Sequence, residues 1–203
     1  MARILWPLNP QSAYRGTSDG TLPIEYQNAL DPLDVLVYVA ANIKSGTAVM
    51  DMFYYTPIML AKRLATLDVL SQGRVISGLA LGWSKDEYQA YNIPFKDRGE
   101  RAEEFIQILK KIWNDDIVEY KGKYYNIPAS KIGPKPFQKL HIPIYLGGFS
   151  SNTFSRIVKQ DLNGWLGVSG PLAQVENGKN QYGTLITVLI PAYMEVLEFP
   201  VSI

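Results

Sequence analysis

The stretch that decides the fold is PIMLAKRLATLDVLSQGRVISGLALGWSKDEYQAYNIPFKDRG, residues 57–99. Apolar residues at helical spacing lead into a turn at 71–74, and an almost wholly apolar run, 75–81, follows. Such a run is typical of a strand buried on both faces, as in a parallel sheet covered by helices. Gly82 and Trp83 come next. Because ligands in α/β folds lie at the carboxyl ends of strands, we expect the functional site here.

The segments on either side continue the alternation of helices and strands. The clearest helical pattern is residues 101–113, in which apolar side chains share one face and charged side chains the other. Residues 97–101 indicate a capped helix start with local ion pairs. The alternation predicts an α/β fold with a parallel sheet. Further helices are predicted at 33–43, from 57 and at 153–159, strands at 45–50, 142–146 and 164–168, and a hairpin at 117–127.

Length and composition indicate one globular domain. The chain has 203 residues, and 47% of them are hydrophobic, which suffices for a single domain or for part of a larger α/β barrel. We expect one domain over residues 1–203, with an irregular segment at 1–30, a core at 31–168 and a divergent segment at 169–203. The apolar, β-prone residues 184–203 have no place in the predicted pattern.

Charge and cysteine content exclude several classes of function. A net charge of +1 gives no electrostatic reason to expect nucleic acid or an anionic membrane as a partner. The absence of cysteine removes disulfides and thiolate chemistry and fits a cytoplasmic location. No secretory signal is visible, and the apolar run 185–203 contains two prolines and two glutamates, which argues against a membrane span. A lone histidine, His141, with no clustered acids around it, predicts no metal site.

Three ordered stretches carry a resemblance to a known family. They are LAKRLATLDVLSQGRVISGLALGW (60–83), DEYQAYNIPFKDRGERAEEFIQILKKIW (86–113) and GKYYNIPASKIGPKPFQKLHIPIYLGGFS (122–150). Together they resemble the bacterial luciferase-like monooxygenase superfamily, and most closely its flavin- and F420-dependent oxidoreductases. The similarity extends over about residues 31–168.

The resemblance implies a TIM-type (β/α)8 barrel, here partial or modified, that binds FMN or coenzyme F420 at its C-terminal face. It also implies hydride transfer or flavin-mediated oxygen chemistry on a small organic substrate, and a homodimer or pairing with another subunit. The first and last units of an eight-unit barrel are not recognisable in this sequence. Because an open barrel leaves two sheet edges, we expect the sheet to close differently, to associate with another chain, or to be destabilised.

Two positions in the first predicted strand match the family's coenzyme site. Ala48 and Val49 lie where the family often has a bulge with a non-proline cis peptide bond behind the coenzyme ring. The residues themselves fit an ordinary buried trans strand as well.

Gly82 and Trp83 match the strand end that approaches the coenzyme. Glycine permits close backbone approach, and an indole can wall a pocket; a turn glycine and a core tryptophan are the alternative. Some related F420-dependent sugar-phosphate dehydrogenases have an acidic residue where Trp83 stands, which argues against that activity. The nearby Asp86 and Glu87 are candidate acid/base groups, although carboxylates early in a helix more often only favour its dipole.

The segment GGFSSN matches the family's phosphate loop, with Gly147, Gly148 and Ser150 as the candidate contacts. Two glycines expose backbone N–H groups, the serine adds a hydroxyl donor, and a helix N-terminus favours an anion. The alternative is an N-cap with a flexible turn. No catalytic acid or base can be assigned from the sequence. Two functions therefore remain open: a coenzyme-dependent oxidoreductase, and a non-catalytic relative that binds a flavin or pairs with another barrel.

Overall fold

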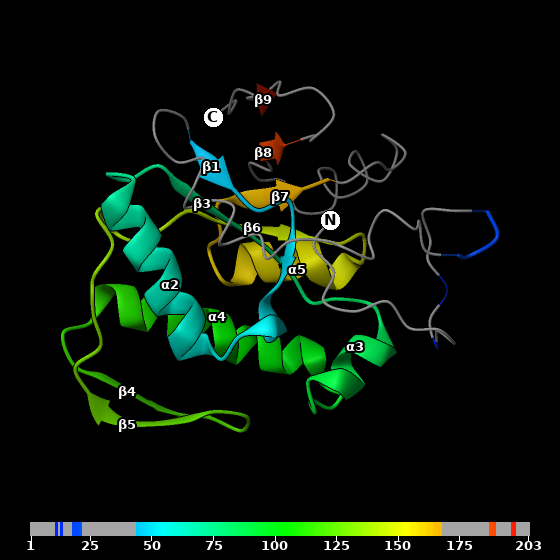
Figure 1. Cartoon of the computed structure of the whole chain (residues 1–203), viewed down its shortest axis with the longest axis horizontal. Helices are drawn as coiled ribbons and strands as arrows, with labels where there is room; N and C mark the ends of the chain where they lie inside the picture. The colour runs from blue at the N-terminus through cyan, green and yellow to red at the C-terminus, as the bar shows by residue number, and fades with distance from the viewer. Residues whose placement is uncertain are drawn as a thin grey trace.

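The computed structural model describes residues 11, 13, 18–21, 44–167, 187–189 and 196–197 (Figure 1). The predicted helix 33–43 and most of the predicted irregular segment 1–30 lie outside the described residues. Within the described part, strands and helices alternate as expected.

One mainly parallel sheet organises the chain (Figure 1). Its strands follow the order β1-β3-β6-β7-β8-β9, and β2 also pairs with β3. All pairs are parallel except the last, β8 with β9. The predicted α/β class with a parallel sheet is therefore confirmed. The strands are β1 (Ser45–Gly46), β2 (Met50–Asp51), β3 (Val75–Ala80), β6 (Ile144–Gly147), β7 (Gly164–Leu166), β8 (Thr187–Leu189) and β9 (Val196–Leu197).

Two short described parts of the segment 184–203, residues 187–189 and 196–197, extend this sheet. Strand β8 pairs in parallel with β7, and β9 returns antiparallel along β8. Among the described residues, the two ends of the strand order, β1 and β9, are not paired with each other.

Four α-helices and one short 3-10 helix accompany the described strands. They are η2 (Met52–Tyr54), α2 (Pro57–Leu70), α3 (Lys85–Ala90), α4 (Arg98–Asn114) and α5 (Ser151–Lys159). Helix α4 begins at residue 98 rather than at the predicted 101. The cap expected there does not form: Asp97 has a left-handed backbone (φ 60°), and its side chain makes no capping hydrogen bond.

The packing of α2 against α4 forms much of the core (Figure 1). The indole Nε1 of Trp113 donates to the carbonyl of Ala61 over 3.0 Å, which joins the two helices by a buried hydrogen bond. The apolar face predicted for α4 is confirmed, because its six members are all buried: Ala102, Phe105, Ile106, Leu109, Ile112 and Trp113.

The predicted hairpin is confirmed as β4 (Val118–Lys121) and β5 (Asn126–Ser130). The Glu104 carboxylate of α4 accepts the backbone N–H groups of residues 123–125 at 2.7, 3.0 and 3.2 Å. Glu100 forms an ion pair with Lys123 at 2.9 Å. The sequence had suggested ion pairs within residues 97–101, but this carboxylate pairs with the hairpin instead.

A fully buried carboxylate, Asp68, ties the end of α2 to the amino end of the sheet. It accepts the backbone N–H of Gln138 at 2.9 Å and the side-chain amide of the same residue at 2.7 Å. The N–H of Val75, the first residue of β3, lies 3.4 Å from the same carboxylate. Hydrogen bonds of this kind fix the starts of β3 and of the segment that leads to β6.

No helix in the described part of the chain combines the length and the apolar character that crossing a bilayer requires.

We predict that Asp68→Ala lowers the free energy of unfolding by about 3 kcal/mol, because it leaves buried donors without acceptors. Urea unfolding monitored by tryptophan fluorescence measures the change. Asp116→Ala, at an exposed position, is the matched control and should change stability by less than about 0.5 kcal/mol. Equal effects of the two substitutions would contradict this account of Asp68.

Candidate functional site

A β-bulge interrupts the first strand of the described sheet. Gly46 pairs with Ile76 and Met50 with Leu79, so the three residues 47–49 oppose only Ser77 and Gly78. The peptide bond between Ala48 and Val49 lies in this bulge and is cis, as the family resemblance predicts. Bulges of this kind bend a strand and redirect its side chains, and they are frequent next to functional sites.

Close packing between strands holds the bulge in place. The Thr47 hydroxyl donates to the carbonyl of Gly78 over 2.6 Å. A Cβ added to Gly78 would lie 1.8 Å from the carbonyl oxygen of Thr47, so only glycine fits there. A Cβ on Gly147, at the end of β6, would lie 2.9 Å from both γ-methyl groups of Val49. The bulge thereby reaches across β3 to the end of β6.

At the end of β3, Gly82 lies against a carboxylate. Its φ is +78°, and a Cβ added to it would lie 1.8 Å from Oδ2 of Asp51. Asp51 ends β2, is only 6% exposed, and accepts the N–H of Phe53 at 2.9 Å. The space that the missing side chain of Gly82 leaves is therefore occupied by the Asp51 carboxylate of this same chain. The neighbouring Trp83 is half-buried.

Two tyrosines beside this strand end keep their protons. Tyr88 donates its hydroxyl to the carbonyl of Leu81. Burial raises the pKa of Tyr88 well above its ordinary value, and the negative charge of Asp51 raises it further. Burial also raises the pKa of Tyr91, with smaller contributions from Tyr54 and from nearby carboxylates. Both phenols are thus neutral in the physiological range.

The loop after β6 is fixed from the next strand. Gly148 has a φ of +121°, a conformation that favours glycine. Its carbonyl accepts the indole N–H of Trp165 at 2.7 Å. Trp165 is 1% exposed and packs against Phe149 and Phe154.

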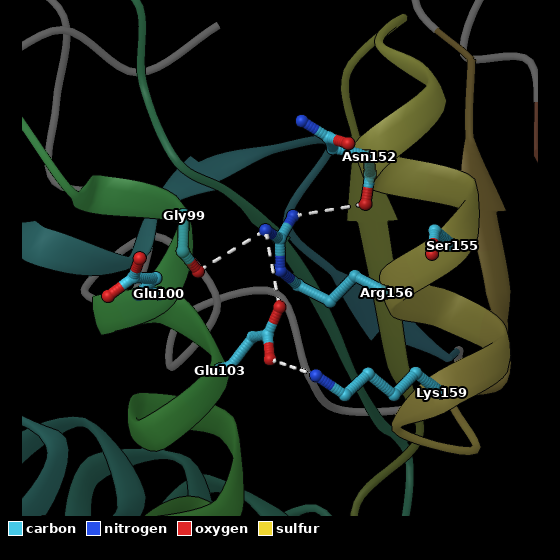
Figure 2. A pocket seen from close by; sticks show the side chains of 7 residues that line it. All are labelled: Gly99, Glu100, Glu103, Asn152, Ser155, Arg156 and Lys159. Carbon is cyan, nitrogen blue, oxygen red and sulfur yellow. Dashed lines mark hydrogen bonds and ion pairs between the residues drawn. The ribbon is translucent and has the colours of Figure 1, made fainter.

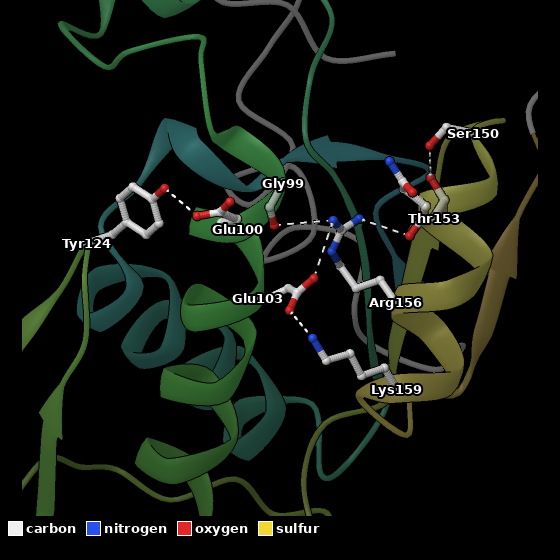
Figure 3. Close-up of polar contacts among 9 residues, drawn as sticks. Gly99, Glu100, Glu103, Tyr124, Ser150, Thr153, Arg156 and Lys159 are labelled. Carbon is white, nitrogen blue, oxygen red and sulfur yellow. Dashed lines mark hydrogen bonds and ion pairs between the residues drawn. The ribbon is translucent and has the colours of Figure 1, made fainter.

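Helix α5 begins directly after this loop (Figure 3). Ser150 occupies the N-cap position, and its carbonyl accepts the N–H of Thr153 at 2.9 Å. Its hydroxyl makes no capping hydrogen bond to the backbone but lies 3.2 Å from the Thr153 hydroxyl. A Cβ on Gly148 would lie 3.0 Å from that same Thr153 oxygen. Glycine therefore avoids a close contact with Thr153 at this turn, where two hydroxyls lie at a helix N-terminus.

The seven predicted coenzyme contacts come from the bulge before β2, from the residues after β3, and from the end of β6 with the loop that follows it. Strands β3 and β6 pair with Leu79 opposite Leu146, so Gly82 and Gly148 follow at the same edge. Six of the seven are half-buried or exposed, which leaves them accessible; Gly147 is buried beneath Val49. The exposed or half-buried residues are Ala48, Val49, Gly82, Trp83, Gly148 and Ser150.

A cavity of about 250 Å³ lies elsewhere, between α4 and α5 (Figure 2). None of the seven predicted residues lines it. Its walls are Gly99, Glu100, Glu103, Asn152, Ser155, Arg156 and Lys159.

Sequence reasoning missed several residues of this edge. Thr47, Asp51, Thr153 and Trp165 act through neighbours that only the folded chain supplies. Of these four residues, only Trp165 could have been noticed from the sequence, because it follows a glycine inside a predicted strand.

Of the remaining candidates, Asp86 accepts the N–H of Gln11 at 2.8 Å, and Glu87 is buried. His141 stacks on Trp113, with 6.4 Å between the ring centroids. Over the described residues, no three side chains of the metal-binding types gather around one point.

We predict that Gly82→Ala destabilises the protein by about 2 kcal/mol or more, because the new methyl group meets the Asp51 carboxylate and φ is positive. Thermal and urea unfolding measure the effect. Gly133→Ala is the control, since a Cβ at that glycine meets no atom within 4 Å. If Gly82→Ala were as stable as the control, the close approach described here would be wrong.

Comparison with known proteins shows the family and the fold. The model of the luciferase-like monooxygenase family matches residues 14–182. An uncharacterised protein of Mycobacterium tuberculosis is 32% identical over 164 residues, which cover 79% of this chain and 58% of that protein. The coenzyme F420-dependent tetrahydromethanopterin reductase of Methanopyrus kandleri has a similar fold, with a TM-score of 0.66 at 22% identity over 80% of this chain and 54% of that one.

Two further relatives have named activities. The FMNH2-dependent dimethylsulfone monooxygenase of Pseudomonas putida is 34% identical over 61% of this chain and 36% of that protein. The F420-dependent glucose-6-phosphate dehydrogenase of Amycolatopsis mediterranei is 34% identical over 53% of this chain and 33% of that protein. The chain thus spans at most 58% of the length of the relatives described here. Its fold corresponds to part of their barrel. This chain belongs to the luciferase-like monooxygenase family.

Proposed function

We propose that this chain binds FMN or coenzyme F420 at the edge formed by β2, β3 and β6, and serves the oxidation or reduction of a small organic substrate. The observation that carries the proposal is the β-bulge at residues 47–49, placed beside the glycine-rich end of β6. Two relatives that are each 34% identical use FMNH2 and F420 by name.

The bulge suits the flat ring system of either coenzyme. Ala48 is exposed and Val49 half-buried, so the bulge offers a small apolar surface just before β2. Trp83, half-buried at the neighbouring strand end, would add an aromatic wall. Apolar and aromatic surfaces with a few polar groups are what bind such ligands.

The loop after β6 suits the phosphate group. A side chain at Gly148 would press on Thr153, and the hydroxyls of Ser150 and Thr153 lie at the first turn of α5. Helix α5 has nine residues, so its N-terminal N–H groups and dipole favour an anion there.

The bound coenzyme would supply the hydride or oxygen chemistry. The protein's part is then to hold the ring against residues 48–49, to anchor the phosphate through residues 148–153, and to position a substrate. The neutral phenols of Tyr88 and Tyr91 would support the walls of the site as hydrogen-bonding groups.

A non-catalytic role is the second candidate, in which the chain binds a flavin or pairs with another barrel. No catalytic acid or base is assigned among the residues proposed for the site. A single domain, a cytoplasmic location and a homodimer or a pair with another subunit remain predictions in either case.

We expect the purified chain to retain FMN or F420 after mixing and desalting, as read by the visible absorbance and fluorescence of the bound coenzyme. Gly148→Leu should abolish retention, because φ at this position is positive and the side chain would press on Thr153. Gly133→Ala, at a glycine with open space around it, should retain the coenzyme like the unmodified chain.

Failure of the unmodified chain to retain either coenzyme would refute the proposal. Retention by Gly148→Leu with unchanged affinity would remove this loop from the site. Turnover of the bound coenzyme with oxygen or with candidate small substrates, followed by absorbance, separates the enzyme from the non-catalytic binder.

A further inference from the structure

A buried cation lies on α5, the helix whose start forms the proposed phosphate site. Arg156 is 6% exposed. Its Nη1 donates to the carbonyl of Asn152 over 3.4 Å, so the side chain folds back toward the beginning of the helix (Figure 3). The guanidinium group therefore lies at the level of the first turn of α5, where Thr153 also lies.

The same side chain joins α5 to α4. Its Nη2 donates to the carbonyl of Gly99, in the first turn of α4, over 3.2 Å. Figure 2 shows the guanidinium group between the two helices, at one wall of the cavity that they enclose. Arg156 thus connects the first turns of two helices that are far apart in sequence.

The positive charge at this place is only partly compensated. Arg156 forms a long ion pair with Glu103, whose Oε1 lies 3.9 Å from Nη2. The other oxygen of Glu103 is 2.7 Å from Nζ of Lys159, so one carboxylate serves two cations. Glu100 is already bound to Lys123 and Tyr124.

One donor of the guanidinium group is also unused. Within the described part of the chain, the buried Nε of Arg156 has no hydrogen-bond partner. Arginine stays protonated in proteins, and a buried charge is screened much less than an exposed one. The field of Arg156 therefore adds to the positive end of the α5 dipole.

We infer that Arg156 is a positioning residue for the coenzyme phosphate: it fixes the first turn of α5 against α4 and adds a buried positive charge there. This inference rests on the proposed function. It predicts that Arg156 affects the affinity for the phosphate-bearing coenzyme and not the affinity for the ring system.

The test compares dissociation constants for FMN and for riboflavin, which lacks the phosphate, by fluorescence titration. If the unmodified chain binds F420 instead, the phosphate-free deazaflavin chromophore takes the place of riboflavin. Arg156→Met should weaken binding of the phosphate-bearing form by about tenfold and leave the phosphate-free form within about twofold. Arg156→Lys keeps the charge, so its affinity for the phosphate-bearing form should lie about midway, on a logarithmic scale, between that of Arg156→Met and that of the unmodified chain.

Lys159→Met is the matched control, because it removes a cation that is 65% exposed at the far end of the same helix and also pairs with Glu103. It should leave both affinities within about twofold, since an exposed charge is screened.

The inference is wrong if the Arg156 variants lower both affinities equally, or lower neither. If the methionine variant does not fold, as its thermal melt will tell, the ratio of the two affinities in the lysine variant decides. If the unmodified chain binds none of FMN, riboflavin, F420 and the deazaflavin chromophore, the proposed function itself is refuted. A change seen only in the Arg156 variants bears on this inference alone.

Discussion

The arrangement of the candidate site depends on the contact between Thr47 and Gly78. The strand 45–51 carries one residue more than its partner, and the extra length must be absorbed without losing the pairing on either side. The hydrogen bond from the Thr47 hydroxyl to the Gly78 carbonyl, and the absence of a side chain on Gly78, let the bulged backbone lie directly on β3. A larger residue at 78 would force the strands apart, and the site would lose its base.

Three glycines allow the strand 45–51 to pack closely against its neighbours. Thr47, Val49 and Asp51 alternate in sequence, and their atoms would meet a Cβ on Gly78, Gly147 and Gly82 respectively. These glycines are thus needed first by the chain's own packing. Under the proposed function, a coenzyme would approach the same edge, where Ala48 is exposed and Gly148 half-buried. This is why glycine patterns alone are weak evidence for a ligand site.

Local pattern predicted most of the fold. Strand 75–81, the apolar face of α4 and the hairpin after it follow from periodicity and turn residues, and the cis bond at 48–49 from the family resemblance. What the sequence did not predict depends on contacts between distant segments. Asp97 looks like a cap but adopts a left-handed backbone, and Glu100 pairs with the hairpin instead of its own helix. In the sequence, nothing distinguishes Arg156 from an ordinary arginine in a helix. Its role appears only in the folded chain, where it is buried against α4.

Charge gives the proposed site a direction. At the β3 side, the Asp51 carboxylate lies against Gly82, and the neighbouring phenols stay neutral. At the β6 side, the N-terminus of α5 and the incompletely compensated Arg156 make the surroundings positive. A phosphate at the β3 end would face a buried carboxylate, whereas at the β6 end it would meet a helix dipole and a cation. A coenzyme with an anionic tail and an uncharged ring therefore has one favourable orientation at this edge, with its ring on the bulge.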